Sequence, residues 1–245
     1  MAEPRALGAP AAEVAPSRVP AGRRFAPGAE SLLDDDLRAL AGKLPSAGGG
    51  LFVLAEFAGP RGIADLLAVT RALPTLERRL SRGSPFLDSP ADASIVAAIP
   101  LGRLRTGETI ARLTGMSPEQ SAVRLRRLAA DGLLTEVGSG YRRPSTITTI
   151  GRCYAIEAKV SDWQQGLRQA LRYASWADAA AVTLLQPPRD LPGVGDRYRA
   201  LGIGLAVRDT WVVRPRLNKP VPALRLLTSE MFAASVAAYN PSGFA

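Results

Sequence analysis

Apolar residues recur along this chain with two different periods, and the change of period marks the expected elements. Four leucines between positions 33 and 44 are spaced for one face of a helix, and Ser31 with Asp34 fits a capping box at its start. Residues 51–57 and 63–70 are apolar runs on either side of a Gly-Pro-Arg-Gly turn, which predicts a strand hairpin. The pattern over residues 71–90 is ambiguous.

Helical spacing dominates the next stretch. It predicts helices over residues 92–99, 106–113 and 117–131, and the third opens with Ser117-Pro118-Glu119-Gln120, which supplies a capping hydroxyl and a proline at the first helical position. A Gly-Ser-Gly turn then joins Leu133–Val137 to Tyr141–Arg143, which predicts a hairpin.

Strand patterns resume after Thr146. The predicted order is strands over 147–150 and 153–160, a helix over 161–177, a buried strand over 179–185, a hairpin of 202–207 with 211–213, and a helix over 226–239. The chain is therefore expected to be an α/β protein whose core, residues 29–75 and 145–245, is split by a helical insert at 88–144. Residues 1–28 are rich in Ala, Pro and Gly and are expected to be a disordered tail.

Composition narrows the possible chemistry. The 245 residues include no histidine and one cysteine, which excludes histidine-dependent nucleophilic catalysis, histidine-ligated metals and a disulfide scaffold. No apolar run approaches the roughly 20 residues that span a bilayer, and the first 28 residues lack the apolar stretch of a secretory signal, so we expect a cytoplasmic protein without a membrane partner. The net charge of +9 favours a polyanionic partner, most simply nucleic acid.

The insert has the layout of a DNA-binding motif. Two helices joined by Thr114-Gly115-Met116 and followed by a Gly-tipped hairpin are the parts of a winged helix-turn-helix. Residues 106–117, together with Leu125, Leu128 and Gly132-Leu133-Leu134, resemble the winged helices of MarR-type and ArsR-type proteins. Such a resemblance implies a recognition helix in the major groove and a wing against phosphates. The implied DNA contacts on the third helix and the wing are Gln120, Arg124, Arg126, Arg127, Tyr141, Arg142 and Arg143.

Val123 lies at the centre of the exposed face of that third helix, where a base-reading side chain would be polar. We therefore expect recognition of the DNA backbone or shape rather than of a tight operator sequence. The alternative is a module that contacts protein or is purely structural.

The sharper chemical signal lies in the α/β part. On the strand Cys153–Val160, alternation places Glu157 and Lys159 on one face and Ala158 on the other. The earlier strand carries one carboxylate, Asp65, in an apolar segment, and a buried carboxylate needs a partner or a metal.

These residues resemble the PD-(D/E)xK, or restriction-endonuclease-like, nuclease superfamily. Asp65 matches the lone aspartate of its second core strand, Glu157-Ala158-Lys159 matches the acidic-x-Lys of the third, and Gln169 with Tyr173 matches a Gln-x-x-x-Tyr pair of some branches. The implied fold is a restriction-endonuclease-like mixed sheet flanked by helices, with the winged helix inserted between its second and third core strands.

The same resemblance implies a phosphodiester-cleaving metal site. Mg²⁺, or Mn²⁺, would be held by Asp65, Glu157 and the carbonyl of Ala158, and Lys159 would orient the attacking water. Glu56 could hold a second metal or a metal-bound water, a role for which Glu30 competes. Gln169 could align Lys159 or contact the DNA backbone. Further candidate DNA contacts on the helix after this strand are Arg168, Arg172 and Tyr173.

Structural alternatives stand beside each assignment. Glu157 and Lys159 could be an ion pair on an edge strand, Asp65 could be a turn or capping residue, and Gln169 with Tyr173 could be a solvated helix stripe. Cys153 is expected to be a small core residue, and Trp163 and Trp176 are expected to be packing anchors.

The sequence thus favours a Mg²⁺-dependent nuclease that binds DNA. A second hypothesis is a winged-helix transcriptional regulator whose nuclease-like domain is catalytically silent and serves as a scaffold for a homodimer. A third is a protein-interaction module that touches no DNA.

Overall fold

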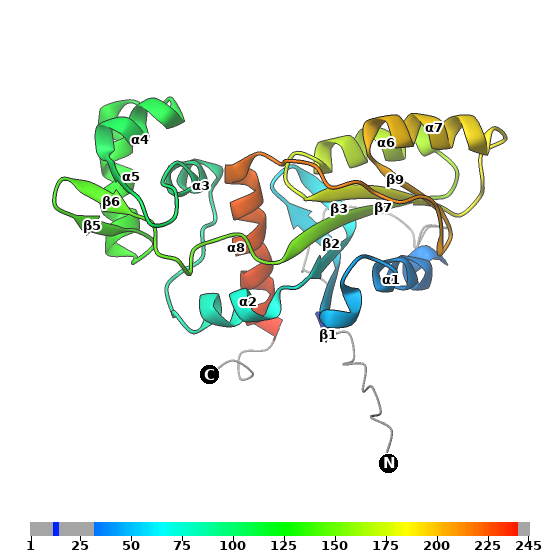
Figure 1. Ribbon diagram of the computed structural model, residues 1–245, viewed down its shortest axis with the longest axis horizontal. Helices are drawn as coiled ribbons and strands as arrows, with labels where there is room; N and C mark the ends of the chain where they lie inside the picture. Colours follow the sequence, from blue (N-terminus) through cyan, green and yellow to red (C-terminus); the bar gives the residue numbers. More distant parts are fainter. Residues whose placement is uncertain (1–11, 15–31, 240–245) are drawn as a thin grey trace, which may run out of the picture.

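The computed structural model describes residues 12–14 and 32–239, and it has a mixed α/β architecture built around one large sheet (Figure 1). The sheet has seven strands in the order β1-β2-β3-β7-β8-β9-β10. These strands are β1 (Ala12–Val14), β2 (Leu51–Gly59), β3 (Gly62–Thr70), β7 (Arg152–Lys159), β8 (Ala179–Leu184), β9 (Gly204–Val207) and β10 (Thr210–Val213). β3 runs antiparallel to both β2 and β7, whereas β7, β8 and β9 are parallel to one another.

Helices cover both faces of this sheet, which explains why a central strand such as β8 is buried along its whole length. α1 (Asp34–Gly42) packs on one face through Leu37 and Ala41. α6 (Trp163–Tyr173) and α7 (Leu191–Leu201) lie side by side on the other face, where Tyr173 and Tyr198 enter the core (Figure 1).

Most of the segment between β3 and β7 forms a second body. It contains α3 (Pro90–Ala97), α4 (Gly107–Thr114), α5 (Pro118–Ala130) and a small antiparallel sheet in the order β4-β6-β5. The three strands of that sheet are β4 (Leu104–Thr106), β5 (Thr135–Val137) and β6 (Gly140–Arg142). α2 (Leu73–Leu80) precedes this body and packs on the core of the large sheet through Leu76. Hydroxyls cap α4 and α5: Thr106 accepts a hydrogen bond from the Thr109 amide, and Ser117 accepts one from the Gln120 amide.

The C-terminal helix α8 (Pro222–Tyr239) stands between the two bodies (Figure 1). Its Phe232 and Ala233 belong to the core under the large sheet, and its Leu226 and Leu227 belong to the core of the insert. Arg79 of α2 and Glu230 of α8 form a fully buried ion pair with an Nη2 to Oε2 distance of 2.7 Å. α8 therefore joins the insert to the sheet by apolar packing, and the buried charge pair binds α8 to α2.

Most predicted elements are confirmed, and the differences have local causes. Residues 147–150, predicted as a strand, form a bend and irregular structure instead, and Ile147 and Ile150, three residues apart, are both buried. α7 has no counterpart among the predicted elements, because Pro192, Gly193 and Gly195 lower helix propensity, although Asp190 caps it.

The start of the chain also departs from expectation. Residues 12–14, placed by sequence in a disordered tail, form β1 and pair in parallel with β2. The other residues of that tail lie outside the described residues, as does Ser31, the predicted cap of α1. The helix itself begins at Asp34 without a side-chain cap. Among the described helices none is long and apolar enough to cross a membrane.

Candidate functional site

Pairing between β3 and β7 ends beside the residues that carry the carboxylates predicted from sequence, Asp65 and Glu157. Pairing between the two strands ends at Leu66↔Ile156, and continuing its register would set Asp65 against Glu157. At this point the backbone amide of Ala158 donates a hydrogen bond to Asp65 Oδ2 at 2.7 Å, so a side chain takes over from the backbone ladder. We call this place, residues 63–65 and 157–159, the β3–β7 fork.

The alternation of inward-facing and outward-facing side chains is also interrupted in the neighbouring strand β2. On β2, Leu54 and Phe57 face the same core although they are three residues apart, and on β3 the same holds for Ala64 and Leu67. Strict alternation is therefore interrupted in both strands at the facing positions Glu56 and Asp65. Glu56 has a φ of 47°, in the left-handed region that side chains other than glycine rarely adopt. Such local strain is frequent near functional sites.

Glu157 and Lys159 share one face of β7, as alternation predicted, and both are buried. Glu157 is 2% exposed, and its Oε1 lies 2.8 Å from the Lys159 ammonium. The ammonium also donates to the carbonyl oxygen of Ala158 at 2.9 Å. The alternative of a surface ion pair on an edge strand is wrong, since β7 lies between β3 and β8 in the sheet.

Tyr173 completes the surroundings of Glu157. Its hydroxyl lies 2.6 Å from Glu157 Oε2 and also contacts the carbonyl oxygen of Ile63. Burial raises the pKa of the Tyr173 phenol, and the negative charges of Glu157 and Asp65 raise it further, so the hydroxyl keeps its proton and donates. Because Tyr173 has no exposed surface, the structure corrects its prediction as a DNA contact.

Gln169 lies on α6, one turn before Tyr173. Gly166, three residues before it, is so close to the sheet that an added Cβ would lie 3.4 Å from Lys159 Cγ, and Tyr173 follows four residues after it. Gln169 is half-buried, and its Oε1 is buried without a hydrogen-bond partner. The solvated-stripe alternative is therefore wrong for Tyr173 and does not describe Gln169 Oε1. Arg168 and Arg172, on other faces of α6, are exposed.

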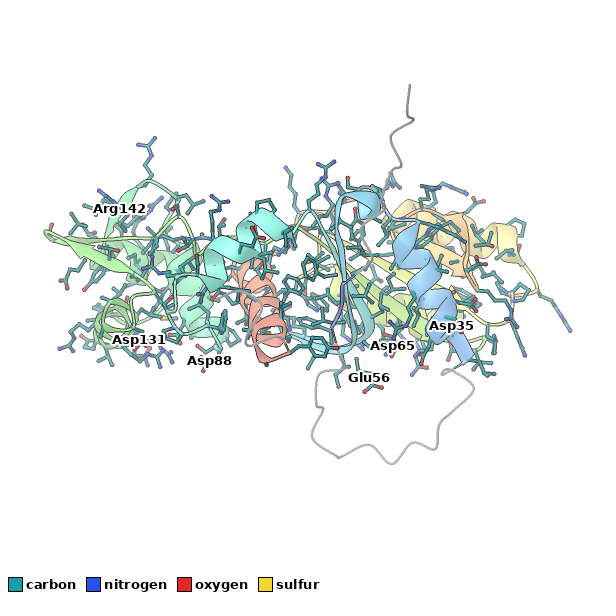
Figure 2. The ribbon with its side chains drawn as sticks, turned by 90° about the horizontal axis from the view of Figure 1, so that it is seen from below. Asp35, Glu56, Asp65, Asp88, Asp131 and Arg142 are labelled. Atoms are coloured by element: carbon teal, nitrogen blue, oxygen red, sulfur yellow. The ribbon has the colours of Figure 1, made fainter. Side chains whose placement is uncertain are left out.

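Two carboxylates form the acidic part of the fork. The described residues contain no group of three or more His, Cys, Asp and Glu side chains that could hold a metal ion. Glu56 is exposed and lies near Asp65 at one edge of the sheet body, well apart from Arg142 (Figure 2). A cation at the fork would rely on Asp65, Glu157, a backbone carbonyl and water. The oxygens of Glu157 and Ala158 already hold one cation, the Lys159 ammonium, so this oxygen set suits positive charge.

The predicted DNA contacts of the insert fall into two groups. Arg124 and Arg127 bind the carboxylate of Asp92 on α3, which is 3% exposed, and Arg143 donates to the carbonyl of Ile147. In contrast, Gln120, Arg126 and Arg142 are exposed, and Tyr141 is half-buried. Sequence reasoning missed the two bonds to Asp92, because 32 and 35 residues separate the partners.

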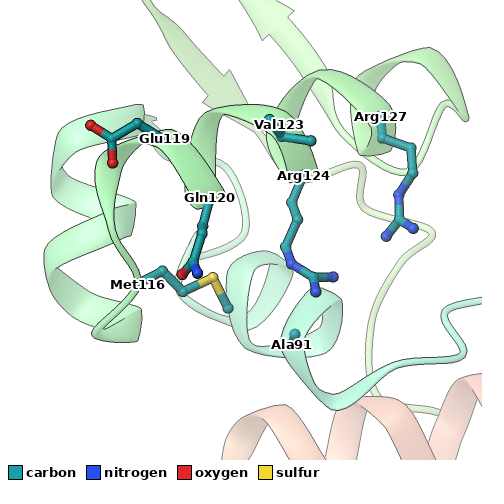
Figure 3. A pocket seen from close by; sticks show the side chains of 7 residues that line it. All are labelled: Ala91, Met116, Glu119, Gln120, Val123, Arg124 and Arg127. Carbon is teal, nitrogen blue, oxygen red and sulfur yellow. The ribbon is translucent and has the colours of Figure 1, made fainter.

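The outer face of α5 borders a groove that is lined by apolar as well as charged side chains. A groove of about 680 Å³ lies between α5 and α3. Its lining residues are Ala91, Met116, Glu119, Gln120, Val123, Arg124 and Arg127 (Figure 3). Val123 is 59% exposed at its edge, which agrees with the predicted apolar centre of the face.

Other buried side chains serve packing. Cys153 is fully buried, and burial raises the pKa of its thiol to about 11. Trp176 is buried against Phe57 and Tyr173, and Trp163 packs at the rim of the same core. As predicted, Cys153 is a small core residue and the two tryptophans are packing anchors.

Comparison with protein-family models gave no match, and neither the curated proteins nor the solved structures gave a significant one. Function must therefore be argued from the geometry of the fork and of the insert.

Proposed function

We propose that this chain is a Mg²⁺-dependent or Mn²⁺-dependent nuclease of the restriction-endonuclease-like type, with a winged helix-turn-helix inserted between its second and third core strands. The observation that carries the proposal is the fork itself. Asp65 on β3 accepts a hydrogen bond from the Ala158 amide, next to Glu157 on β7; Lys159 pairs with Glu157, and the Tyr173 hydroxyl donates to Glu157. The order of α1, β2, β3, β7, α6 and β8 supports the same assignment.

The residues of the fork suit phosphodiester hydrolysis without an imidazole. Asp65, Glu157 and the carbonyl of Ala158 are hard oxygen donors of the kind that Mg²⁺ and Mn²⁺ prefer. A bound divalent cation would supply Lewis-acid polarisation of the scissile phosphate and a lowered pKa for the attacking water. Lys159 orients that water and offsets developing negative charge, while Tyr173 fixes the Glu157 carboxylate.

DNA is the proposed substrate because the chain carries a net charge of +9 and the insert presents exposed basic side chains. Arg126 on α5 and Arg142 on β6 are exposed, so their guanidinium groups are available for phosphates. Arg124 and Arg127 are bound to Asp92 and contribute less. This arrangement fits contact with the DNA backbone better than base reading by the centre of α5.

A cleavage assay on supercoiled plasmid tests the nuclease proposal. Wild-type protein with Mg²⁺ or Mn²⁺ is expected to nick the plasmid, and Asp65→Ala and Lys159→Ala are expected to abolish nicking while DNA binding persists. Asp88→Asn is a matched control, because Asp88 is an exposed aspartate outside the fork. Nicking that survives Asp65→Ala or Lys159→Ala would overturn the proposal.

DNA binding by the insert is tested separately by salt titration. Arg126→Ala and Arg142→Ala should each weaken binding and lower the slope of log affinity against log salt by about one. Unchanged slopes in both variants would remove the insert from the DNA interface.

A catalytically silent DNA-binding regulator is the second candidate. The absence of a three-ligand acidic or Cys/His group among residues 12–14 and 32–239 favours it. It predicts DNA binding with preference for one sequence, and no metal binding at the fork.

A further inference from the structure

The Lys159 ammonium sits between two oxygens that the proposed metal site requires. It lies 2.8 Å from Glu157 Oε1 and 2.9 Å from the carbonyl oxygen of Ala158. Its stem is held from the helix side, since an added Cβ on Gly166 would come within 3.4 Å of Lys159 Cγ. The side chain is 9% exposed, so water screens this contact weakly.

A divalent cation and this ammonium cannot share these oxygens. Mg²⁺ binds oxygen at about 2.1 Å and Mn²⁺ at a similar distance, so a metal ion bound to both atoms would lie within a few ångström of the ammonium nitrogen. Repulsion between the two cations is strong at such a distance in a poorly hydrated place. Entry of the metal therefore requires Lys159 to leave its present position.

We propose that Lys159 is an internal counter-ion of the fork, which occupies the cation position in the metal-free protein and lowers its affinity for divalent metal. The inference rests on the proposed metal site and adds a second role for a residue of that site. Glu157 is 2% exposed, and its carboxylate would be costly to bury without positive charge beside it. Lys159 supplies that charge until a metal replaces it, and the released ammonium is then available to the phosphate and the attacking water.

If Lys159 merely helped to hold the metal, replacing it would weaken metal binding. The counter-ion role predicts the opposite effect on metal affinity. Replacing Lys159 should abolish cleavage but strengthen metal binding. Lys159→Met is the most suitable variant because it keeps a long apolar stem beside Gly166 while removing the charge. Lys159→Gln repeats the test with a neutral polar side chain if Lys159→Met does not fold.

Calorimetric titration with Mn²⁺ in the absence of DNA, at about pH 8 so that carboxylates are ionised, measures the effect. Lys159→Met is expected to bind Mn²⁺ at least about tenfold more tightly than wild type, which is about 1.4 kcal/mol. Lys219→Ala removes an exposed lysine elsewhere and should bind Mn²⁺ as wild type does. Lys159→Arg keeps a positive charge at this position, and its Mn²⁺ affinity should stay as weak as that of the wild type.

The double variant Glu157→Gln with Lys159→Met tests whether the tighter Mn²⁺ binding of Lys159→Met arises at the fork. It should lose the tighter binding, because one of the two shared oxygen donors is weakened. Equal or weaker Mn²⁺ affinity in Lys159→Met, or a gain that persists in the double variant, would overturn the counter-ion role. The nuclease proposal fails on a different result, namely plasmid cleavage that survives Asp65→Ala.

Discussion

Removal of one hydroxyl, in Tyr173→Phe, tests whether the fork is held in place from the helix layer. The hydroxyl contacts Glu157 Oε2 at 2.6 Å and the Ile63 carbonyl, and both it and Glu157 are buried. It has a single proton, so the substitution removes about one hydrogen bond to a charged group, which contributes roughly 1.5–3 kcal/mol. For a chain of this size, a loss of about 2 kcal/mol lowers Tm by about 4–8 °C.

Tyr198→Phe is the matched control. Tyr198 is also fully buried, and its hydroxyl donates to the neutral carbonyl of Trp163 at 2.7 Å. Loss of a neutral hydrogen bond should lower the free energy of unfolding by only about 1 kcal/mol. Urea unfolding of both variants, with unchanged m-values, gives the comparison.

The two variants should also differ in activity. A shift of about an ångström in a catalytic carboxylate can lower the rate on the order of a hundredfold, so Tyr173→Phe should slow plasmid nicking strongly and Tyr198→Phe should not. Equal losses of stability together with equal nicking rates would refute the assignment of Tyr173 as a positioning residue for Glu157.

Three further outcomes are expected. Glu230→Ala should destabilise the protein by about 3–5 kcal/mol in urea unfolding because it leaves Arg79 buried and unpaired, whereas the double change of both residues to Met should recover most of that loss. Burial alone would raise the pKa of Asp92, but hydrogen bonds from Ser89 and two arginines hold it below the ordinary value. Its stabilisation should therefore be present at neutral pH and be lost as the pH falls from about 4 through the lowered pKa, and Asp92→Asn should remove this part of acid unfolding. The Cys153 thiol, with a pKa of about 11, should resist alkylation at pH 8 in native protein and react in urea, as mass spectrometry would show.

The fork could be predicted because it depends on local rules. Alternation along a strand is enough to place Glu157 and Lys159 on one face, and an apolar segment around Asp65 is enough to indicate burial. That β3 and β7 are neighbours was implied only by the resemblance to the nuclease superfamily, and the structure places the two strands side by side.

Other features depend on tertiary contacts that periodicity does not report. The bonds of Arg124 and Arg127 to Asp92 join α5 to α3, and the pair of Arg79 with Glu230 spans 151 residues. The left-handed φ of Glu56 has no signal in an apolar strand pattern, because the strain arises where two strands change face together. Local patterns therefore predicted the pairing face and burial of Glu157 and Lys159, but not the tertiary contacts that hold them.

A bound metal ion at the fork is the most direct test of the whole interpretation. Crystals soaked in Mn²⁺ should give an anomalous difference peak about 2.0–2.3 Å from carboxylate oxygens of Asp65 and Glu157 and from the carbonyl oxygen of Ala158, with the Lys159 ammonium displaced. A map with no peak at the fork at saturating Mn²⁺, and Lys159 still bound to Glu157, would contradict it.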